Sequence, residues 1–590
     1  MCGIAGYQTS DGTALPEGVL DKFIHALAHR GPDGTGRHVA DGLGLAHTRL
    51  AVIDLQTGDQ PFFGPNQTVS VANGEIYNYL ELREEYSGAP FATQSDCEIP
   101  LFSYQREGDA FTRDLRGMYA VALADYSAGS LHLSRDPFGI KPLYYAQTQH
   151  GLVFASEPQA IIAAGQLRPT IDNEIATQLL QLQFTTGRRT IFDAVLRVLP
   201  GERLEFRNGR VAKQHRAGAL PDGPPSDMSE GEALKLLDDV LMDSVMVHQR
   251  SDVPYGMFLS GGIDSSALLA CMARLNERPV RAFTAGFPGT AVQDERDHAR
   301  RVAKAAGAEH IEIAVTENDF WGNLPAIAAA MDDPVADYAI VPTFLLAREA
   351  AKELKVVLSG EGGDELFAGY GRYRRAVRSA LLGGRQMYAR GALDGLGVLR
   401  AETKDWRKGI EAAEQEPLGR NWSRLQAAQA TDVAEWLPND LLLKLDRCLM
   451  AHGVEGRTPF LDPVVADLAF RLPDDLKVRN RTGKYLLRRW LEQALPEADP
   501  FSKKRGFTVP VGDWIASHAG ELAPLMAQNQ GISEICRPDE VGRLFRGLGG
   551  GDTKRTGRAC WRLLFYALWH RIRVEGAEPL GDTATVLAGK

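Results

Sequence analysis

Phe258-Leu259-Ser260-Gly261-Gly262-Ile263-Asp264-Ser265-Ser266 is the stretch around which the second half of the chain is organised. An apolar run, 253–259, leads into it, and a helix-compatible run, 267–275, follows it. This layout can bind phosphate, because glycine lets the backbone approach a ligand and the first N–H groups of a helix point at its oxygens. The kinase-type loop, G-x-x-x-x-G-K followed by Ser or Thr, does not occur in the sequence. The stretch therefore predicts a different anion-binding turn, with an ordinary Gly/Ser turn as the alternative.

A second glycine-rich acidic turn follows a predicted strand at 355–358. It reads Ser359-Gly360-Glu361-Gly362-Gly363-Asp364-Glu365. Strands alternating with helices favour a parallel sheet, in which ligands bind at the carboxyl ends of strands. We therefore expect the two turns side by side. Asp264, Asp364 and also Glu361 offer the oxygen ligands that Mg²⁺ prefers, although Asp and Gly are also common in plain turns.

Length and composition indicate a multidomain globular protein. A chain of 590 residues is too long for a single hydrophobic core. Its content of 44% hydrophobic and 24% charged residues is typical of globular proteins. The net charge of −10 argues against a nucleic-acid partner. The sequence has no apolar run of the ~18 residues needed to span a membrane, and this argues against a membrane partner. It also shows no signal peptide. Six scattered cysteines without a C-x-x-C pair predict no zinc site or disulfide framework, and the cytoplasm is the expected location.

The amino terminus, Met1-Cys2-Gly3-Ile4, suggests a nucleophile. Removal of Met1 would leave Cys2 with both a thiol and a free α-amine, whose ordinary pKa is near ~8. The amine could take the thiol proton and return it to a leaving group, so one residue would supply nucleophile and base. An incidental buried cysteine is the alternative.

Four further motifs follow Cys2 in order: His29-Arg30-Gly31-Pro32-Asp33-Gly34, Arg49-Leu50-Ala51-Val52-Ile53-Asp54, Asn73-Gly74-Glu75-Ile76-Tyr77-Asn78 and Ser95-Asp96-Cys97-Glu98. With them, the first 200 or so residues resemble the N-terminal-nucleophile (Ntn) glutaminase domain of class II amidotransferases. The resemblance implies an α+β αββα sandwich of two antiparallel sheets between helical layers. Local patterns agree, since 118–125 and 131–134 read as strands and 95–107 reads as a helix.

The resemblance implies a role for each motif residue in glutamine hydrolysis. Arg49 suits the substrate carboxylate, because guanidinium binds it with two parallel bonds, and Asp96 suits the ammonium. Asn73 and Gly74 would form an oxyanion hole, in which one donor is typically worth ~3 kcal/mol. The full set expected at glutamine is Arg49, Val52, Ile53, Asn73, Gly74, Glu75 and Asp96. Singly, Arg49 could be a surface ion pair and Asn73-Gly74 a hairpin turn.

The second half carries motifs of its own. The string S-G-G-x-D-S-S resembles the pyrophosphate loop of ATP pyrophosphatases, which have an α/β fold like that of adenine nucleotide α-hydrolases. Asp446-Arg447, 451–462, 483–488 and 503–507 resemble the synthetase half of glutamine-dependent asparagine synthetases. We expect a glutaminase domain at 2–215, a Pro/Gly-rich linker at 216–228, a synthetase domain at 229–520 opened by a Ser229/Glu232 capping box, and a helical extension at 521–590.

This second resemblance assigns the ATP site. Leu259 and Ala285 would contact the nucleotide, Ser359 and Gly360 would lie by the AMP, and Glu361 and Lys484 would be catalytic, with Lys484 over the transferring phosphate. The pyrophosphate would be held by Ser260, Gly261, Gly262, Asp264, Ser265 and Ser266, and Mg²⁺ by Asp264 and Asp364. A solvated helix lysine is the alternative for Lys484.

Together the two halves imply a glutamine-dependent asparagine synthetase. Cys2 would hydrolyse glutamine, and ammonia would pass through a dry channel to a β-aspartyl-AMP made from aspartate and ATP. The products would be asparagine, glutamate, AMP and pyrophosphate. The resemblance is also compatible with a homodimer.

The acceptor pocket is where the sequence departs from the family pattern. Segment 332–342 lacks the Thr-rich stretch with an arginine found in some asparagine synthetases. A different carboxylate, on a peptide, a sugar or a modified amino acid, is therefore an alternative acceptor. A non-catalytic protein that keeps the fold is another alternative. The last ~70 residues carry no usable motif, and 558–573 reads as an amphipathic helix.

Overall fold

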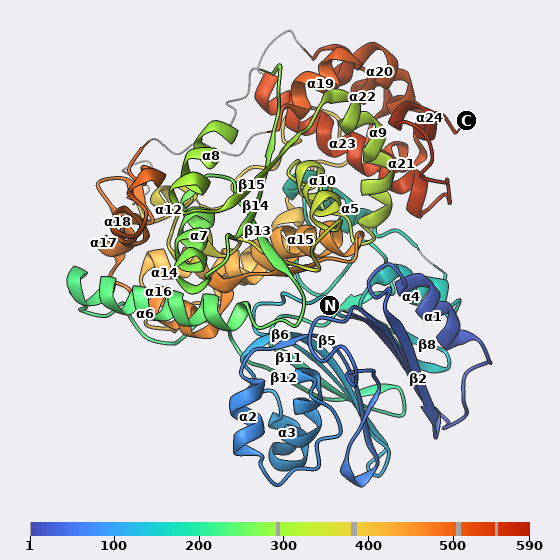
Figure 1. The fold of residues 1–590 in the computed structure, drawn as a ribbon. Coiled ribbons are helices and arrows are strands. Elements are labelled where there is room, and N and C mark those ends of the chain that lie inside the picture. The colour runs from blue at the N-terminus through green and yellow to red at the C-terminus, as the bar shows by residue number, and fades with distance from the viewer. Residues whose placement is uncertain are drawn as a thin grey trace.

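A computed structural model describes residues 2–168, 170–290, 295–378, 386–502, 509–548 and 553–589. The motif at 503–507 lies outside these residues. The described chain folds into two units in contact (Figure 1): a two-sheet unit at the bottom of the view and a larger unit, built on a parallel sheet, above it.

Two antiparallel six-stranded sheets form the described part of the first unit, in the orders β10-β8-β9-β1-β3-β2 and β12-β11-β7-β6-β5-β4. The first sheet contains β1 (Gly3–Thr9), β2 (Gly34–Ala40), β3 (Leu43–Arg49), β8 (Tyr144–Thr148), β9 (Gly151–Ala155) and β10 (Leu196–Arg197). The second contains β4 (Phe62–Phe63), β5 (Thr68–Ile76), β6 (Gly117–Asp125), β7 (Ser130–Arg135), β11 (Glu202–Arg207) and β12 (Arg210–Arg216).

Strand β6 shows how the layers are built. Ala120 and Ala122 face the core between the two sheets, while Val121 and Leu123 face the helices outside, as the two-residue period of a strand requires. Helices α1 (Val19–Leu27) and α4 (Pro158–Ala163) cover the first sheet, and α2 (Tyr79–Glu85) and α3 (Ile99–Glu107) cover the second. The described unit is thus the expected sandwich of helix, two sheets and helix.

The predicted strands at 118–125 and 131–134 are confirmed as β6 and β7. The predicted helix at 95–107 is confirmed only in part, because residues Asp96–Glu98 form a tighter 3₁₀ turn, η2, before α3. Pro100 lies in the first turn of α3, where its missing N–H costs nothing.

The second unit contains a five-stranded parallel sheet in the order β15-β14-β13-β16-β17. Its strands are β13 (Tyr255–Phe258), β14 (Arg281–Gly286), β15 (Glu309–Ala314), β16 (Val356–Leu358) and β17 (Glu455–Arg457). A separate two-stranded ribbon is formed by β18 (Val478–Arg479) and β19 (Thr482–Gly483). The parallel sheet predicted from the alternating pattern is confirmed.

Helices cover both faces of this sheet, and β16 alternates accordingly: Val356 and Leu358 pack on one side, Val357 on the other. On the first side lie α6 (Glu230–His248), α7 (Ile263–Leu275), α8 (Arg296–Ala305), α16 (Pro463–Arg471), α17 (Asp474–Lys477) and α18 (Tyr485–Ala494). On the second lie α9 (Glu317–Ala330), α10 (Ile340–Ala350), α15 (Leu442–Met450), α19 (Val511–Ser517), α20 (Ala519–Gln528), α21 (Gln530–Ile535), α22 (Pro538–Arg546), α23 (Thr553–Arg573) and α24 (Thr583–Ala588).

Short helices complete the unit. They are α11 (Gly363–Leu366), α12 (Gly371–Ala376), α13 (Lys408–Gln415), α14 (Arg424–Thr431) and a π-helical segment, η6 (Asp432–Leu441). Pro438 lies inside η6, where it removes a backbone donor and favours the wider turn. At the start of α6, Ser229 accepts from the Glu232 N–H at 3.3 Å, so the predicted cap is present; the reciprocal Glu232 bond of a full capping box is not formed among the described residues.

Helix α23 differs from the amphipathic helix predicted at 558–573. Residues 563–569 are all buried, because α23 packs against α9 and α19 and also against α5 (Asn173–Leu182) of the first unit. The predicted helix is confirmed within α23, but its middle part is buried on all sides and not on one face alone. Figure 1 shows α23 inside the red carboxyl-terminal group of helices.

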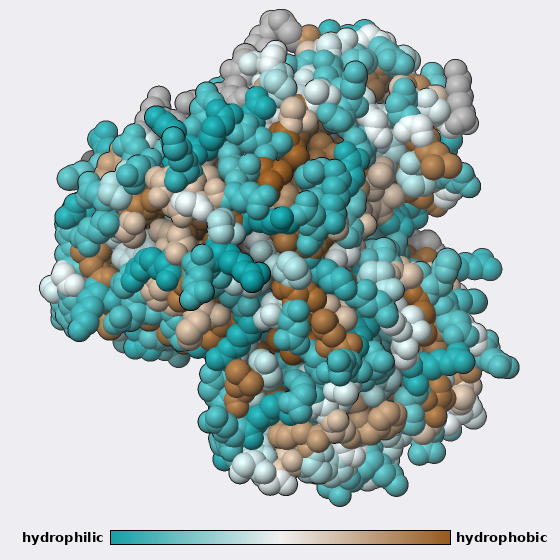
Figure 2. All heavy atoms as spheres, in the orientation of Figure 1, coloured by the Kyte–Doolittle hydropathy of each residue, from teal (hydrophilic) through white to brown (hydrophobic). Residues whose placement is uncertain are grey.

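The surface is mixed in character. Hydrophilic residues cover most of the face in Figure 2, with hydrophobic residues in small groups. Among the described helices, none has the length and apolar character that crossing a membrane requires.

Candidate active sites

Cys2 is buried directly before β1. Its backbone nitrogen lies 3.0 Å from Oδ1 of Asn73, and its sulfur lies 4.0 Å from the carbonyl oxygen of Leu50. Burial raises the pKa of the Cys2 thiol, so a base is needed to form the thiolate. In a chain without Met1, the nitrogen beside Asn73 is a free α-amine, which can serve as that base.

Asn73 and Gly74 lie next to each other on β5. The side-chain nitrogen of Asn73 is buried and has no hydrogen-bond partner among the described residues. At Gly74, a Cβ atom would lie 2.1 Å from the Met118 carbonyl oxygen, so only glycine permits this close strand pairing. The pair leaves a buried donor close to Cys2, as an oxyanion hole requires.

Arg49 and Asp96, the residues predicted to bind the carboxylate and the ammonium of glutamine, are both buried. Arg49 bonds the Asp54 carbonyl oxygen and pairs with Asp59 at 2.7 Å. The Asp59 carboxylate is 80% exposed, so solvent weakens this pair and another carboxylate can replace it. Asp96 accepts a 2.7 Å bond from the Ile76 N–H, and burial raises the pKa of Asp96.

The remaining glutamine-site residues contact the second unit. The Val52 carbonyl oxygen accepts a 3.0 Å bond from the Asp252 N–H, and Ile53, next to it, is partly buried. Glu75 lies 3.3 Å from the Arg457 guanidinium on β17. Burial raises the pKa of Glu75, and the nearby charge of Glu455 adds to the shift. The second unit therefore forms part of the wall around this site.

Arg30 joins Cys2 to the second unit. Its Nε donates to the Cys2 carbonyl oxygen at 3.2 Å, and its two terminal nitrogens bond the Asp446 carboxylate at 2.8 and 3.0 Å. Burial disfavours the charge of Arg30, but Asp446 and Glu157 outweigh it and raise the pKa of Arg30. A buried and fully ionised pair thus connects the nucleophile to helix α15.

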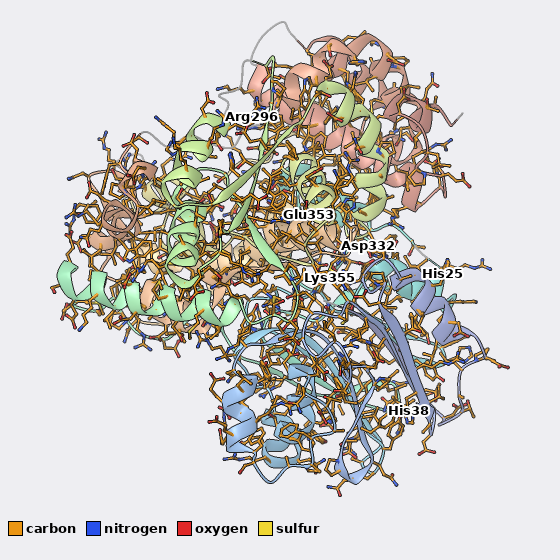
Figure 3. All side chains as sticks on the ribbon, viewed as in Figure 1. His25, His38, Arg296, Asp332, Glu353 and Lys355 are labelled. Carbon is orange, nitrogen blue, oxygen red and sulfur yellow. The ribbon has the colours of Figure 1, made fainter. Side chains whose placement is uncertain are left out.

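Further ion pairs lie along the same boundary. Across the boundary, Lys355 is 2.7 Å from Asp33 and the Arg197 guanidinium is 2.7 Å from Asp333, next to Asp332. Figure 3 shows Asp332 and Lys355 where the second unit meets the first. The two units are therefore held by specific charged contacts as well as by apolar packing.

The stretch 259–262 forms the turn between β13 and α7. Gly261 has a φ of 70°, which favours glycine. The Ser260 hydroxyl accepts from the Gly262 N–H at 3.2 Å and lies 3.1 Å from the Ser265 hydroxyl. These bonds close the turn at the N-terminus of α7, where backbone N–H groups can bind an anion.

The second acidic turn lies beside the first, as expected, because β13 and β16 are adjacent and parallel. The turns touch: a Cβ atom on Gly363 would lie 2.4 Å from Oδ1 of Asp264. Glu361 accepts a hydrogen bond from the Ser359 hydroxyl. The site therefore lies where strand order reverses, the usual ligand position in such sheets.

Lys484 lies between the two predicted metal ligands. Its ammonium contacts the Asp264 carboxylate and lies 2.7 Å from Asp364. Burial lowers the pKa of Lys484, but the two carboxylates outweigh this effect and raise it. Two carboxylates from separate turns thus converge on one cation, an oxygen set that also suits Mg²⁺.

Two cavities meet at these turns. The larger, about 510 Å³, is lined by the predicted residues Leu259, Ser260, Asp264, Ser265, Ala285, Ser359, Gly360, Glu361 and Asp364. The smaller, about 220 Å³, is lined by Gly261, Gly262 and Lys484, with Ser260, Asp264 and Asp364. Ser266 lines neither cavity and is buried in α7.

The larger cavity has a second wall that sequence reasoning did not assign. Its residues are Asp337, Tyr338, Trp436, Lys444, Arg558, Trp561 and Arg562. They come from a loop, η6, α15 and α23, so no local motif links them. The weak signal was the segment 332–342, which was expected at the acceptor pocket and supplies Asp337 and Tyr338.

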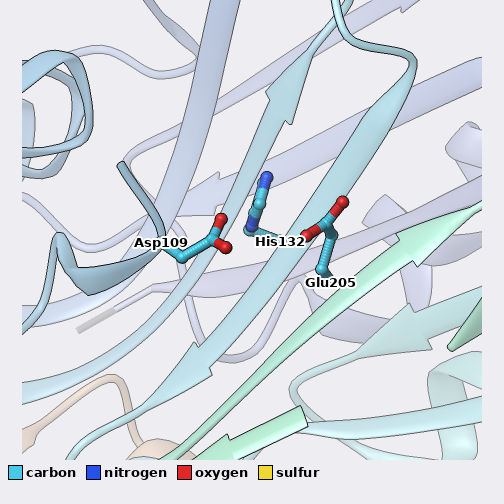
Figure 4. A group of neighbouring side chains, drawn as sticks. All are labelled: Asp109, His132 and Glu205. Carbon is cyan, nitrogen blue, oxygen red and sulfur yellow. The ribbon is translucent and has the colours of Figure 1, made fainter. Parts of the chain in front are cut away.

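A separate cluster of Asp109, His132 and Glu205 brings three metal-type ligands together (Figure 4). The ammonium of Lys213 lies 2.8 Å from both carboxylates. A side-chain cation therefore already balances their charge, and we assign no metal to this cluster.

Comparison with known proteins defines the class. The family model for asparagine synthase matches residues 236–571, and the model for a glutamine amidotransferase domain matches residues 1–216. The chain belongs to the asparagine synthase family and carries the amidotransferase domain at its amino end.

Similar proteins match over nearly the full length. The chain is 33% identical to asparagine synthetase [glutamine-hydrolyzing] 1 of Bacillus subtilis, over 98% of this chain and 97% of the relative. It is 36% identical to a putative asparagine synthetase [glutamine-hydrolyzing] of Mycobacterium tuberculosis, over 98% of both chains. Asparagine synthetase B [glutamine-hydrolyzing] of Escherichia coli is 30% identical, over 87% of this chain and 83% of the relative.

Proposed function

We propose that this protein makes asparagine from aspartate, ATP and glutamine. The observation that carries the proposal is the presence of two sites on one chain. At the first, buried Cys2 lies beside the unpartnered side-chain N–H of Asn73. At the second, two glycine-rich turns of the phosphate-binding type converge on Lys484, and buried ion pairs connect the two units. The names of the full-length relatives support the same reaction.

In the first half-reaction, the Cys2 sulfur attacks the side-chain amide carbon of glutamine. The α-amine of Cys2 takes the thiol proton and delivers it to the leaving ammonia. The Asn73 side-chain N–H and the Gly74 N–H stabilise the oxyanion, while Arg49 binds the glutamine carboxylate and Asp96 its ammonium. Water then hydrolyses the thioester and releases glutamate.

In the second half-reaction, the aspartate β-carboxylate attacks the α-phosphorus of ATP, and pyrophosphate leaves. We assign the second unit to the ATP-pyrophosphatase fold, supported by its central β13, the turn at 259–262 and the neighbouring turn at 359–362. Lys484 offsets negative charge that builds at phosphorus. Ammonia then attacks the acyl adenylate, AMP leaves, and Glu361 accepts a proton from the attacking nitrogen.

Asp264 and Asp364 fit Mg²⁺, since their oxygens already converge on a cation. When bound there, the ion would neutralise pyrophosphate charge and favour its departure. Lys484 supplies part of that neutralisation from the chain itself.

We divide the chain functionally into a glutaminase domain at 2–215, a linker at 216–228 and a synthetase domain from 229. The buried packing of α23 and the family match to residue 571 support extending the synthetase domain beyond 520. The helices after 520 then belong to the catalytic unit.

Replacement of the nucleophile tests the proposal. Cys2→Ala should abolish asparagine formation from glutamine and preserve formation from ammonium salts, because only the first site loses its nucleophile. Cys536→Ala, which removes a buried thiol in the carboxyl-terminal helices, should retain both. Loss of both activities in folded Cys2→Ala would contradict the two-site proposal, and ATP–pyrophosphate exchange with another acid but not aspartate would contradict the acceptor.

A further inference from the structure

Helix α23 contributes to the lining of the larger cavity, together with the two glycine-rich turns. Arg558, Trp561 and Arg562 lie one turn apart on this helix, and all three line the cavity. The cavity also contains Ser260 and Ser359 of the two turns. A ligand that extends beyond a nucleotide bound at the turns would therefore meet α23.

The same helix is fastened to the loop expected at the acceptor pocket. The Trp561 indole N–H donates to the Ala336 carbonyl oxygen at 2.8 Å, and the Ala336 N–H donates to the Gln183 carbonyl oxygen at 2.8 Å. Arg562 donates to the Gln183 side chain at 3.2 Å. The acceptor loop and α23 thus form one packed wall. A cationic side chain for the acceptor pocket can therefore come from α23, since the loop itself contains no arginine.

The cations on this wall differ in how their charge is satisfied. Lys444 is buried and lies 3.1 Å from Asp337. Arg562 spends its donors on the Leu180 and Gln181 carbonyl oxygens and on Gln183. Arg558 is exposed to the cavity, and within the described residues its guanidinium has neither a hydrogen bond nor an ion pair. It is the cation on this wall that is available to a ligand.

We propose that Arg558 binds the carboxylate of the acceptor that does not react, and so restricts the acceptor to an amino acid with two carboxylates. A guanidinium holds a carboxylate through two parallel hydrogen bonds, and no arginine occurs in segment 332–342 to do so. This assignment rests on the proposed function, since it takes the adenylate to form at the glycine-rich turns.

The first test compares two acceptors in the unaltered protein: aspartate and its α-amide. The α-amide keeps the β-carboxylate but lacks the α-carboxylate that Arg558 is proposed to bind. ATP–pyrophosphate exchange should show a KM for the α-amide at least about 10-fold above that for aspartate, as expected for loss of a charged hydrogen bond. Equal KM values would overturn the role of Arg558. No exchange with aspartate would instead contradict the proposed function itself.

The variant Arg558→Ala should raise the KM for aspartate roughly 10- to 100-fold. The KM for ATP and the rate of glutamine hydrolysis should stay nearly unchanged. The variant should also lose the preference for aspartate over the α-amide, and Arg558→Lys should recover part of it. Arg555→Ala is the matched control, because Arg555 lies on the same helix but bonds the Asp394 carbonyl oxygen. An unchanged KM for aspartate in Arg558→Ala, with glutamine hydrolysis intact, would refute the assignment.

Discussion

Lys484 at the second site and Asn73 at the first differ in whether their polar groups already have partners. Lys484 is neutralised by Asp264 and Asp364, whereas the Asn73 side-chain nitrogen is buried without a partner among the described residues. An unmet buried donor costs about 1–3 kcal/mol, and an oxyanion can recover that free energy. The interaction is therefore reserved for the transition state, as catalysis requires.

Asn73→Ala should lower the kcat of glutamine hydrolysis by about 10²- to 10³-fold, the usual cost of one oxyanion-hole donor. Ammonia-dependent synthesis should stay near its original rate, because the second site is untouched. Steady-state glutamate release measures the first and asparagine formation from ammonium the second. Asn173→Ala, an exposed change at the start of α5, is the control; wild-type hydrolysis in Asn73→Ala would remove Asn73 from the site.

Residues within motifs could be placed from sequence, because a motif carries its own geometry. Asp264 and Asp364 were expected together at strand ends and do converge. Arg558 and Lys444 could not be placed, because they come from helices distant in sequence and only tertiary packing brings them to one wall. The Arg30–Asp446 ion pair could not be predicted either, because the two residues belong to separate motifs and nothing in either motif indicates the other as a partner.

At the scale of elements, the close contact of the two glycine-rich turns sets the ATP site. Gly363→Ala should impair ATP-dependent activity by 10-fold or more, because the new Cβ would lie 2.4 Å from Oδ1 of Asp264 and displace it. Alanine otherwise favours a helix such as α11, so the loss would report the contact. Glutamine hydrolysis should persist.

Gly322→Ala is the matched control for this change, since a Cβ there would meet nothing within 4 Å. The measurement is ATP–pyrophosphate exchange in both variants. Full exchange in Gly363→Ala would show that the turns tolerate separation and would contradict the assigned site.

Periodic patterns predicted some elements well and others poorly. Strand β6 could be read from sequence because its alternating residues serve two different cores. The full burial of the middle of helix α23 could not, because an apolar stripe predicts one buried face and does not reveal that α5, α9 and α19 surround the helix. The early 3₁₀ turn before α3 depends on local capping that periodicity does not report.

For the whole molecule, buried charges at the boundary of the two units make assembly depend on pH. Burial opposes ionisation of Glu455, but surrounding positive charges, first the chain's terminal amine and then Arg457 and Lys141, outweigh it and lower its pKa from 4.5 to about 2. Between these values the unfolded chain binds a proton that the folded chain does not. The contribution of Glu455 to stability is therefore complete above about pH 4.5 and is lost as pH falls toward 2.

Glu455→Gln should consequently unfold at a lower temperature at pH 7, since it removes one of the buried carboxylates that balance the charges of Arg457 and Lys141. Its midpoint should also fall less than that of the unaltered protein between about pH 5 and pH 3. Thermal unfolding followed by circular dichroism measures both. Exposed Glu402→Gln is the control, and a parallel pH dependence in Glu455→Gln and the unaltered protein would argue against this account.

The central claim is that one chain frees nitrogen at Cys2 and fixes it at the second site without releasing it. The most direct measurement supplies glutamine labelled with ¹⁵N at the side-chain amide, together with a large excess of unlabelled ammonium, and determines the isotope in newly formed asparagine by mass spectrometry. The account predicts that the asparagine amide carries mostly ¹⁵N. An isotope content equal to that of the bulk ammonium pool would contradict it.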